Sequence, residues 1–177
     1  MKIALHFTAL LLALAALAGC ASNPEIRPAR PVITGKPASM DTILVTAASA
    51  LGDLTTETNV LNDAIYSGLN ESKMFLRVTQ NDPATNSDDG IKIAAEIRQI
   101  KKVSDHAREW SGALAGRAWV LVRVTVSDLR SGNTIEVFEV MGQSGKSAFA
   151  GTTNEAILRA AEQVVAEILK LNAQTGP

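Results

Sequence analysis

The sequence contains only one cysteine, Cys20, and only two histidines among its 177 residues. A single thiol cannot form a disulfide within the chain, and it gives no cysteine-based metal site of the usual spacing. Aromatic residues make up only 4% of the chain, and no block of like charge is longer than Lys101-Lys102. The formal net charge is −1, so nucleic acid is not an expected partner.

The N-terminal residues have the pattern of a secretory signal. Lys2 is followed by an apolar run over residues 10–17, and Ala18-Gly19 precedes Cys20. A transmembrane or buried helix is the alternative, but the run is short for a membrane span and ends at a polar stretch. We therefore expect residues 1–19 to be a signal peptide.

Leu17-Ala18-Gly19-Cys20 resembles the lipobox of bacterial lipoproteins. The resemblance implies that the Cys20 thiol receives diacylglycerol and that the new amino group is acylated, by a chain such as palmitate. Several chains are needed for a firm anchor, because each buried methylene contributes only about 0.8 kcal/mol. Ala21 and Ser22 follow the cysteine where aspartate would retain a lipoprotein in the inner membrane. We therefore expect a lipid anchor on the periplasmic face of the cell outer membrane.

Residues 20–40 form a polar segment with Pro24, Pro28, Pro31 and Pro37. This composition favours an extended tether, which at about 3.1 Å per residue reaches about 60 Å from the bilayer. The alternative is that part of the tether packs on the domain as an edge strand.

Residues 41–172 are expected to form a single periplasmic α/β domain, followed by a disordered tail at 173–177. Hydrophobic periodicity predicts strands and helices in the order β-α-β-β-β-β-α. The strands are expected at 42–46, 75–79, 91–97, 120–128 and 133–141, and the helices at 56–71 and after Thr152, where Glu155 completes a capping-box pattern. This order predicts an α+β two-layer sandwich, with a mixed sheet of about five strands and two helices packed on one face.

The first helix is expected to bury one stripe that contains Leu61, Ile65 and Leu69. Glu57, Asn62, Asp63 and Asn70 are expected to face away from the core. The later helix has a broad apolar face from Ala156 to Leu169, which must bury against the sheet.

The last two strands are expected to form a hairpin with the three-residue loop Arg130-Ser131-Gly132, whose glycine suits a left-handed position. With Leu129 opposite Asn133, the numbers of paired residues sum to 262. This register pairs apolar residues with each other and joins two opposite charges, as sheets favour. The expected pairs are Val122 with Val140, Arg123 with Glu139, and Val124 with Phe138.

No motif of this chain indicates catalysis or a cofactor. Gly145-Lys146-Ser147 resembles the end of a nucleotide-binding loop, but that pattern needs glycine at the position of Val140. Asp105, His106 and Glu109 are a weak metal-ligand set in a charged segment, where solvated side chains are the usual outcome. No nucleophile elbow or distinctive carboxylate pair is present. We expect no enzyme activity, nucleotide, metal or other cofactor.

The sheet face away from the helices is the candidate site. Its apolar residues, with two from the preceding loop, are Trp110, Leu114, Trp119, Leu121, Val137 and Met141. An exposed apolar face of this size marks a partner surface. The alternative is that the tether, the loop or another helix covers it. A charge at Leu121 or Trp119 is expected to abolish binding in the first case and to destabilise the domain in the second.

The segment Ser111-Gly112-Ala113-Leu114-Ala115-Gly116-Arg117-Ala118, the strand over 120–128 and the turn Ser131-Gly132 resemble a family of uncharacterised bacterial lipoproteins with a domain of unknown function. These proteins are similar in fold to CsgG and to the N-terminal domain of TolB. The resemblance implies a periplasmic α/β domain used for protein association. This chain departs from CsgG because it has no extra pair of long amphipathic hairpins, so secretion-channel activity is not expected. The leading hypothesis is a non-enzymatic lipoprotein that binds another envelope protein. The alternative is a small-molecule or glycan-binding lipoprotein, which needs a concave pocket. A hydrolase ranks third.

Overall fold

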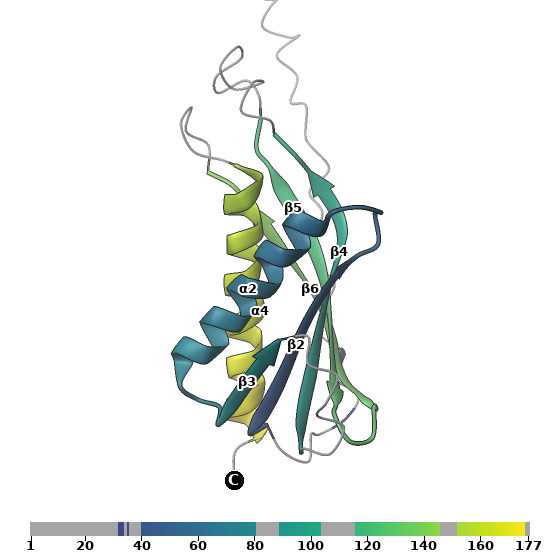
Figure 1. Ribbon diagram of the computed structural model, residues 1–177, viewed down its shortest axis with the longest axis vertical. Helices are drawn as coiled ribbons and strands as arrows, with labels where there is room; N and C mark the ends of the chain where they lie inside the picture. Colours follow the sequence, from purple (N-terminus) through teal and green to yellow (C-terminus); the bar gives the residue numbers. More distant parts are fainter. Residues whose placement is uncertain are drawn as a thin grey trace, which may run out of the picture.

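The computed structural model describes residues 32–33, 35, 40–80, 89–103, 116–145 and 152–175. Within them lie strands and helices in the following chain order (Figure 1): β1 (Val32–Ile33), β2 (Thr42–Ser49), α2 (Thr55–Ser72), β3 (Arg77–Gln80), β4 (Gly90–Lys101), β5 (Trp119–Asp128), β6 (Thr134–Gln143) and α4 (Thr153–Thr175). The described strands form one sheet in the order β1-β6-β5-β4-β2-β3. No helix of this described part is long and apolar enough to span a membrane.

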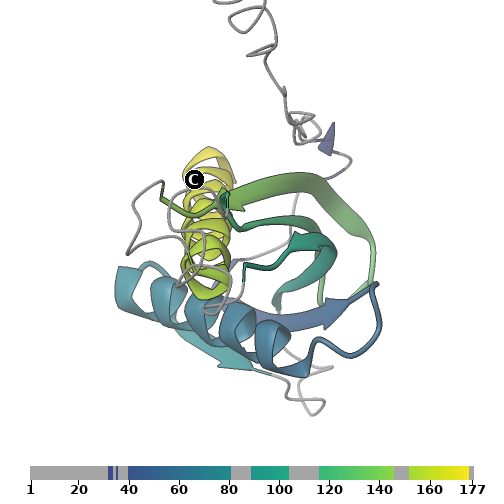
Figure 2. The same cartoon turned by 90° about the horizontal axis from the view of Figure 1, so that it is seen from above.

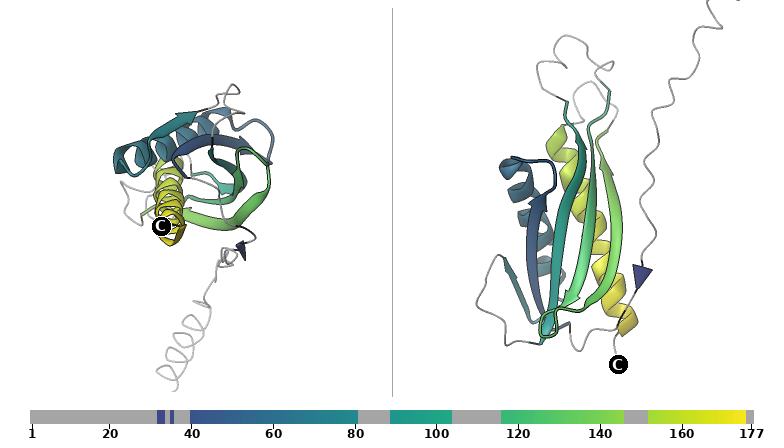
Figure 3. Two further views of the ribbon diagram at one scale, coloured as in Figure 1. Left: turned by 90° about the horizontal axis from the view of Figure 1, so that it is seen from below. Right: turned by 90° about the vertical axis from the view of Figure 1, so that its right-hand side faces the viewer.

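The sheet is mixed, and both helices lie on one side of it. β2 is parallel to β3 and β4, whereas β5 is antiparallel to β4 and β6. α2 connects β2 with the parallel β3, as a crossover helix does. Figure 2 shows the curvature of the sheet, and Figure 3 (right) shows the sheet in front of both helices. The predicted α+β class and two-layer arrangement are therefore confirmed.

The core fills the space between the helices and the sheet. The stripe of α2 is buried as predicted, and α4 contributes its broad apolar face. Opposite the helices, strand alternation turns every second residue of β5 and β6 into this core. Fully or almost fully buried side chains include Leu61, Ile65 and Leu69 from α2, Ile157, Val164 and Ile168 from α4, and Val122, Val124 and Phe138 from the sheet.

Two polar residues of α2 do not face away from the core as expected. Asn62 is buried, and its Oδ1 has no hydrogen-bond partner in the described part of the chain. Glu57 is half-buried and pairs with Lys102, whose hydrogen bond lowers the pKa of the Glu57 carboxyl. The physical reason is that α2 contacts α4 as well as β2 and β3. Its buried arc is therefore wider than a single stripe.

The predicted register of the β5–β6 hairpin is confirmed, because Arg123 pairs with Glu139 and Val124 pairs with Phe138. The turn itself is different. Regular pairing ends at Ser127 and Thr134, after a shift that leaves Ile135 as an extra residue. The predicted opposition of Leu129 and Asn133 is therefore wrong.

Asp128 explains the longer turn. Its Oδ1 accepts hydrogen bonds from the Ser131 amide at 2.7 Å and from the Ser131 hydroxyl at 2.8 Å. Such a side-chain contact replaces part of the strand pairing with a local turn. Gly132 has φ 71°, the left-handed conformation that the sequence predicted for it.

Part of the tether forms the edge strand β1, which was the alternative interpretation of residues 20–40. Val32 pairs with Val137, and the Gly35 amide donates to the Ile135 carbonyl at 3.2 Å. Pro31 and Pro37 flank this strand and do not interrupt it. The sheet therefore has a sixth, short strand at the open edge of β6.

The C-terminal helix is longer than predicted. The sequence predicts a disordered tail at 173–177, but α4 continues to Thr175. Ala173 and Gln174 have good helix propensity, and the helix breakers Gly176 and Pro177 come only after them. The predicted tail is therefore wrong for residues 173–175.

Glu136 is a buried carboxylate on the helix-facing side of β6, next to Val126 of β5. Burial, and to a lesser degree Glu167 on α4, raises its pKa above 4.5. A carboxyl with a raised folded-state pKa contributes stability at low pH, and this contribution is lost as the pH rises through the folded-state value.

We expect Glu136→Gln to raise the melting temperature at neutral pH and to remove part of the stability loss that wild type shows above about pH 4.5. Thermal melts of both proteins between about pH 4 and pH 8 measure this effect. An unchanged or lower melting temperature of the variant at neutral pH would contradict the expectation.

Candidate functional site

The face of the sheet away from the helices, here called the outer face, is built mainly by β5 and β6. Side chains alternate along β5, and Val122 and Val124 point into the core. Trp119, Leu121 and Arg123 therefore point to the outer face. In β6 the corresponding residues are Val137, Glu139 and Met141. The register places Leu121 beside Met141 and Arg123 beside Glu139. Neither α2 nor α4 packs on the outer face, which Figure 3 (right) shows in front.

Exposure varies along the outer face. Leu121 is only 5% exposed, although it is not part of the core between the helices and the sheet. Trp119, Val137 and Met141 are half-buried, and Arg123 is exposed. The face is therefore covered at Leu121 and partly open around it. Trp110 and Leu114, which are expected on the same surface from the sequence, lie outside the described residues.

Charged residues cross the middle of the outer face. Arg123 pairs in register with Glu96 of β4 on one side and with Glu139 of β6 on the other. Opposite charges at paired positions stabilise neighbouring strands. The row separates the patch around Trp119 and Met141 from the end of the sheet where the hairpin turns. An apolar patch beside charged residues is a common composition for a protein interface.

β4 also contributes to this patch, which the sequence pattern did not predict. β4 extends to Lys101, and a register shift between Ile97 and Gln99 brings Gln99 beside Leu121 and Lys101 beside Trp119. The signal in the sequence is the end of strict apolar alternation after Ile97. A bulge at that point changes which side chains reach the outer face.

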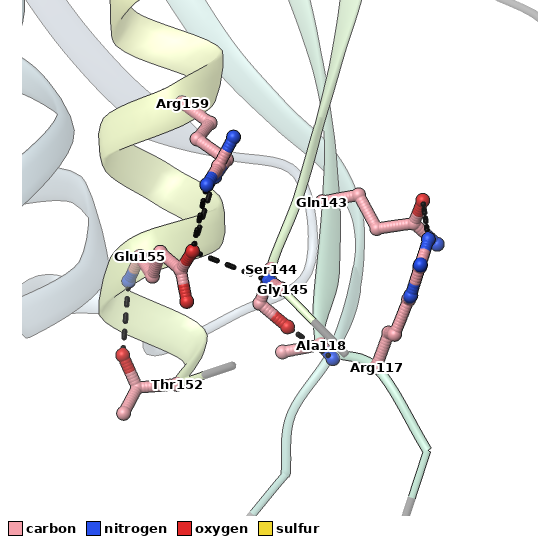
Figure 4. Close-up of polar contacts among 8 residues, drawn as sticks. All are labelled: Arg117, Ala118, Gln143, Ser144, Gly145, Thr152, Glu155 and Arg159. Atoms are coloured by element: carbon pink, nitrogen blue, oxygen red, sulfur yellow. Dashed lines mark hydrogen bonds and ion pairs between the residues drawn. The ribbon is translucent and has the colours of Figure 1, made fainter. Parts of the chain in front are cut away.

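The glycine-rich segment after β6 has a structural role (Figure 4). The Ser144 amide donates to the Ala118 carbonyl at 2.9 Å, and the Ala118 amide donates to Ser144 Oγ at 3.0 Å. The Gly145 amide donates to Glu155 Oε1 at 3.2 Å. A phosphate-binding loop needs such amides free for the ligand, and here two of them already have partners. Lys146 and Ser147 lie outside the described residues.

The same cluster attaches the ends of β5 and β6 to the first turn of α4 (Figure 4). Thr152 caps the helix as predicted, because its hydroxyl accepts the Glu155 amide at 3.0 Å. The Glu155 carboxylate also binds Arg159 one turn later, at 3.0 Å. Arg117 donates to Gln143 Oε1 at 3.0 Å. These contacts fix the helix against the strands that form the outer face.

The weak metal-ligand set of Asp105, His106 and Glu109 lies outside the described residues, as does Cys20, the expected lipid-attachment residue. Within the ranges that the structure does describe, no three His, Cys, Asp or Glu side chains are positioned to hold a metal ion. The outer face is therefore the candidate site that the described geometry supports.

The sequence pattern of one protein family, the Domain of unknown function (DUF4410), matches residues 24–148. No curated protein has a sequence that matches the chain. In fold, the chain is similar to the PelC dodecamer from Paraburkholderia phytofirmans, with a TM-score of 0.54, 10% identity, and coverage of 78% of this chain and 96% of that chain.

Two further solved structures have a similar fold. The hypothetical protein CT253 from Chlamydia trachomatis has a TM-score of 0.54 and 12% identity, over 77% of this chain and 99% of that chain. Protein XCC0632 from Xanthomonas campestris has a TM-score of 0.50 and 14% identity, over 80% and 92%. At these identities the similarity shows the fold alone. The expected similarity to CsgG and to the N-terminal domain of TolB stays a prediction.

Proposed function

The chain belongs to the DUF4410 family of domains of unknown function, and we propose that it is an outer-membrane lipoprotein that faces the periplasm and binds another envelope protein through its outer face. In this proposal Cys20 carries the lipid anchor, and the domain acts as a non-enzymatic accessory module of an envelope process. No cofactor, nucleotide or nucleic acid takes part.

The observation that supports the proposal is the partly open apolar patch on a face that neither helix covers. Trp119 and Met141 are half-buried there on one side of the charged row through Arg123, and Val137 is half-buried on the other side of that row, toward the hairpin turn. Apolar side chains that remain accessible beside charged residues gain from burial against a partner. The Ser144 and Glu155 contacts fix the strands to α4. The patch therefore loses little conformational freedom when a partner binds.

The solved PelC structure is described as a dodecamer, so a chain of this fold can carry surfaces that join protein chains. This supports protein binding over the glycan-binding alternative. No feature of the described residues supports a glycan site. A second copy of this chain is one partner that the outer face could accept.

The anchor is tested by Cys20→Ser. Because no other residue offers a thiol, we expect this variant to remain unlipidated and either uncleaved or soluble. Mass spectrometry of the protein from membrane and soluble fractions measures both effects. A wild-type mature chain that begins at another residue, or that carries no lipid on Cys20, would disprove the anchor.

The outer face is tested by Trp119→Glu in lipidated protein, with in-cell crosslinking and pull-down as the readout. We expect the captured partner to fall by about tenfold or more, as for the loss of an interface anchor. Leu158→Glu is the matched control, because Leu158 is exposed on α4 in the helix layer. Melting curves of both variants are recorded in parallel, and equal capture by Trp119→Glu and wild type would refute the proposed surface.

A further inference from the structure

Lys101 and Arg117, here called the cation pair, lie at the end of the outer face where β5 begins. Lys101 pairs in register with Trp119, the first residue of β5. Arg117 comes two residues before Trp119 in the sequence, and its Nη1 donates to Gln143 Oε1 at 3.0 Å. Gln143 pairs with Trp119 from the β6 side, and Figure 4 shows the Arg117 side chain extended toward it. The two cations are therefore placed next to one aromatic residue.

The cation pair has no anionic partner in the described part of the chain. The exposed Lys101 takes part in no described hydrogen bond or ion pair, and a Cβ atom on Gly116 would lie 3.4 Å from its Nζ. The ammonium group is therefore close to the residue that precedes Arg117. Two like charges near each other gain from an anion that binds both. Lys102 differs from Lys101, because it already pairs with Glu57.

Arg117 also has an unused donor that is shielded from water. Its side chain is half-buried, and its Nε is buried without a hydrogen-bond partner among the described residues. A guanidinium offers several N–H donors, and the contact with Gln143 uses one of them. A buried donor without a partner costs free energy until an acceptor reaches it. A carboxylate is the acceptor that fits, because it can bind a guanidinium through two parallel hydrogen bonds.

The cation pair adjoins the apolar part of the outer face. Along β5, Trp119 is followed on the same side by Leu121, which lies beside Met141 of β6. Successive residues of a strand are about 3.4 Å apart, so positions 117 to 121 extend over about 14 Å. A short extended segment of another chain can therefore contact the cations and the apolar residues together.

The neighbouring charges favour a polypeptide over a membrane surface as the occupant. The row beside the apolar residues contains Glu96 and Glu139, on either side of Arg123. An anionic bilayer that reached the cation pair would bring its headgroups close to these two carboxylates, which it repels. A polypeptide can place a single carboxylate on the cations and apolar side chains on the rest of the patch. The charge pattern of the outer face is therefore complementary to a segment of mixed composition.

We propose that the cation pair binds an Asp or Glu side chain of the partner protein, within an extended segment that also covers the apolar patch. This inference rests on the proposed function, because it states which kind of segment the outer face accepts. An apolar residue about two to four positions from the acidic one covers Trp119 and Leu121, since that spacing matches the strand beneath it. Binding therefore has an electrostatic part that weakens as the salt concentration rises.

The experiment begins with the partner segment that contacts the outer face in cells. A photoreactive amino acid at position 141 of the lipidated protein captures it, and mass spectrometry locates the site of attachment in the partner. Two fluorescent synthetic peptides are then made, one with the sequence of that segment and one with its Asp and Glu changed to Asn and Gln. Fluorescence anisotropy with the purified full-length protein gives a dissociation constant for each peptide.

We expect the neutral peptide to bind the wild-type protein about tenfold more weakly than the acidic peptide. Lys101→Glu combined with Arg117→Gln should weaken the acidic peptide by about the same factor and leave the neutral peptide unchanged. Lys101→Glu alone, at an exposed position, should weaken the acidic peptide by about threefold. High salt should bring the two peptides closer in affinity for the wild-type protein.

Lys92→Glu is the matched control. Lys92 lies on the same side of β4, because Ile91 and Ile93 next to it enter the core, but it lies beyond Glu96 from the cation pair. The control changes the net charge as Lys101→Glu does, and it should alter the affinity of the acidic peptide by about twofold or less. Melting curves of all variants establish that the fold is kept, and the comparison of the two peptides on wild-type protein needs no variant.

Equal binding of the two peptides to the wild-type protein, or an effect of Lys92→Glu as large as that of Lys101→Glu, would overturn the inference and leave the proposed partner surface intact. A captured segment without Asp or Glu would do the same. A product that contains phospholipid and no protein would assign the cation pair to a headgroup and overturn the inference together with the proposed function. No product from position 141 would also overturn both.

Discussion

Replacing Gly142 by alanine is expected to lower the free energy of unfolding by about 3 kcal/mol. Gly142 lies near the end of β6, where the backbone of α4 comes close to the strand. A Cβ atom at this position would overlap the Ala156 carbonyl oxygen and would lie 2.6 Å from the Ala160 amide nitrogen. Both are backbone atoms of α4, so no side-chain rotation can relieve the overlap and the helix itself must move.

The matched control is Gly132→Ala in the hairpin turn. Gly132 has φ 71°, but no heavy atom of the described chain lies within 4 Å of its added Cβ. Only the strain of the left-handed conformation remains, which costs about 1–2 kcal/mol. Urea denaturation of both variants separates the two causes. An effect at Gly142 no larger than that at Gly132 would contradict the close packing of β6 on α4.

Leu121→Asp is expected to destabilise the domain by about 3 kcal/mol or more, because it places a charge where the side chain is almost fully covered. Leu121 is 5% exposed in the isolated chain. Of the two outcomes expected for a charge at this position, the burial of Leu121 therefore favours destabilisation over loss of binding with an intact fold, and Trp119 is the better probe of binding. The same substitution at Leu158, which is 43% exposed on α4, should change stability by about 1 kcal/mol or less.

Circular dichroism melts of Leu121→Asp and Leu158→Asp measure this difference directly. If the two variants melt together, Leu121 is open to solvent in solution and the description of the outer face is wrong. If only Leu121→Asp is destabilised, Leu121 belongs to the covered part of the outer face.

The hairpin register could be predicted from the sequence because it depends on local signals. Apolar alternation, the pair Arg123 and Glu139, and the glycine at position 132 agree on one register. The turn was predicted one step too short, because a bulge at Ile135 has no hydrophobic pattern of its own. β1 is only an alternative in the sequence for a similar reason. A strand of two residues is defined by the edge it pairs with and not by its own periodicity.

The candidate site was predicted in part. Alternation correctly turns Trp119, Leu121 and Met141 to the side away from the helices. The burial of Leu121 was not predictable, because alternation gives the side of the sheet on which a residue lies and not what covers it. The exposure of Leu76 was also missed. The sequence predicts a strand at 75–79, but its partner β2 begins at Thr42, which pairs with Arg77. Residues 75 and 76 therefore lie beyond the end of the pairing.

The most direct test of the proposed function is photo-crosslinking in living cells with Cys20 intact. A photoreactive amino acid replaces Met141 on the outer face in one protein and Leu158 on α4 in the other. We expect one discrete crosslinked product from position 141, its loss when Arg123→Glu is added, and none of that product from position 158. No product from position 141, or the same product from both positions, would contradict a partner surface on the outer face.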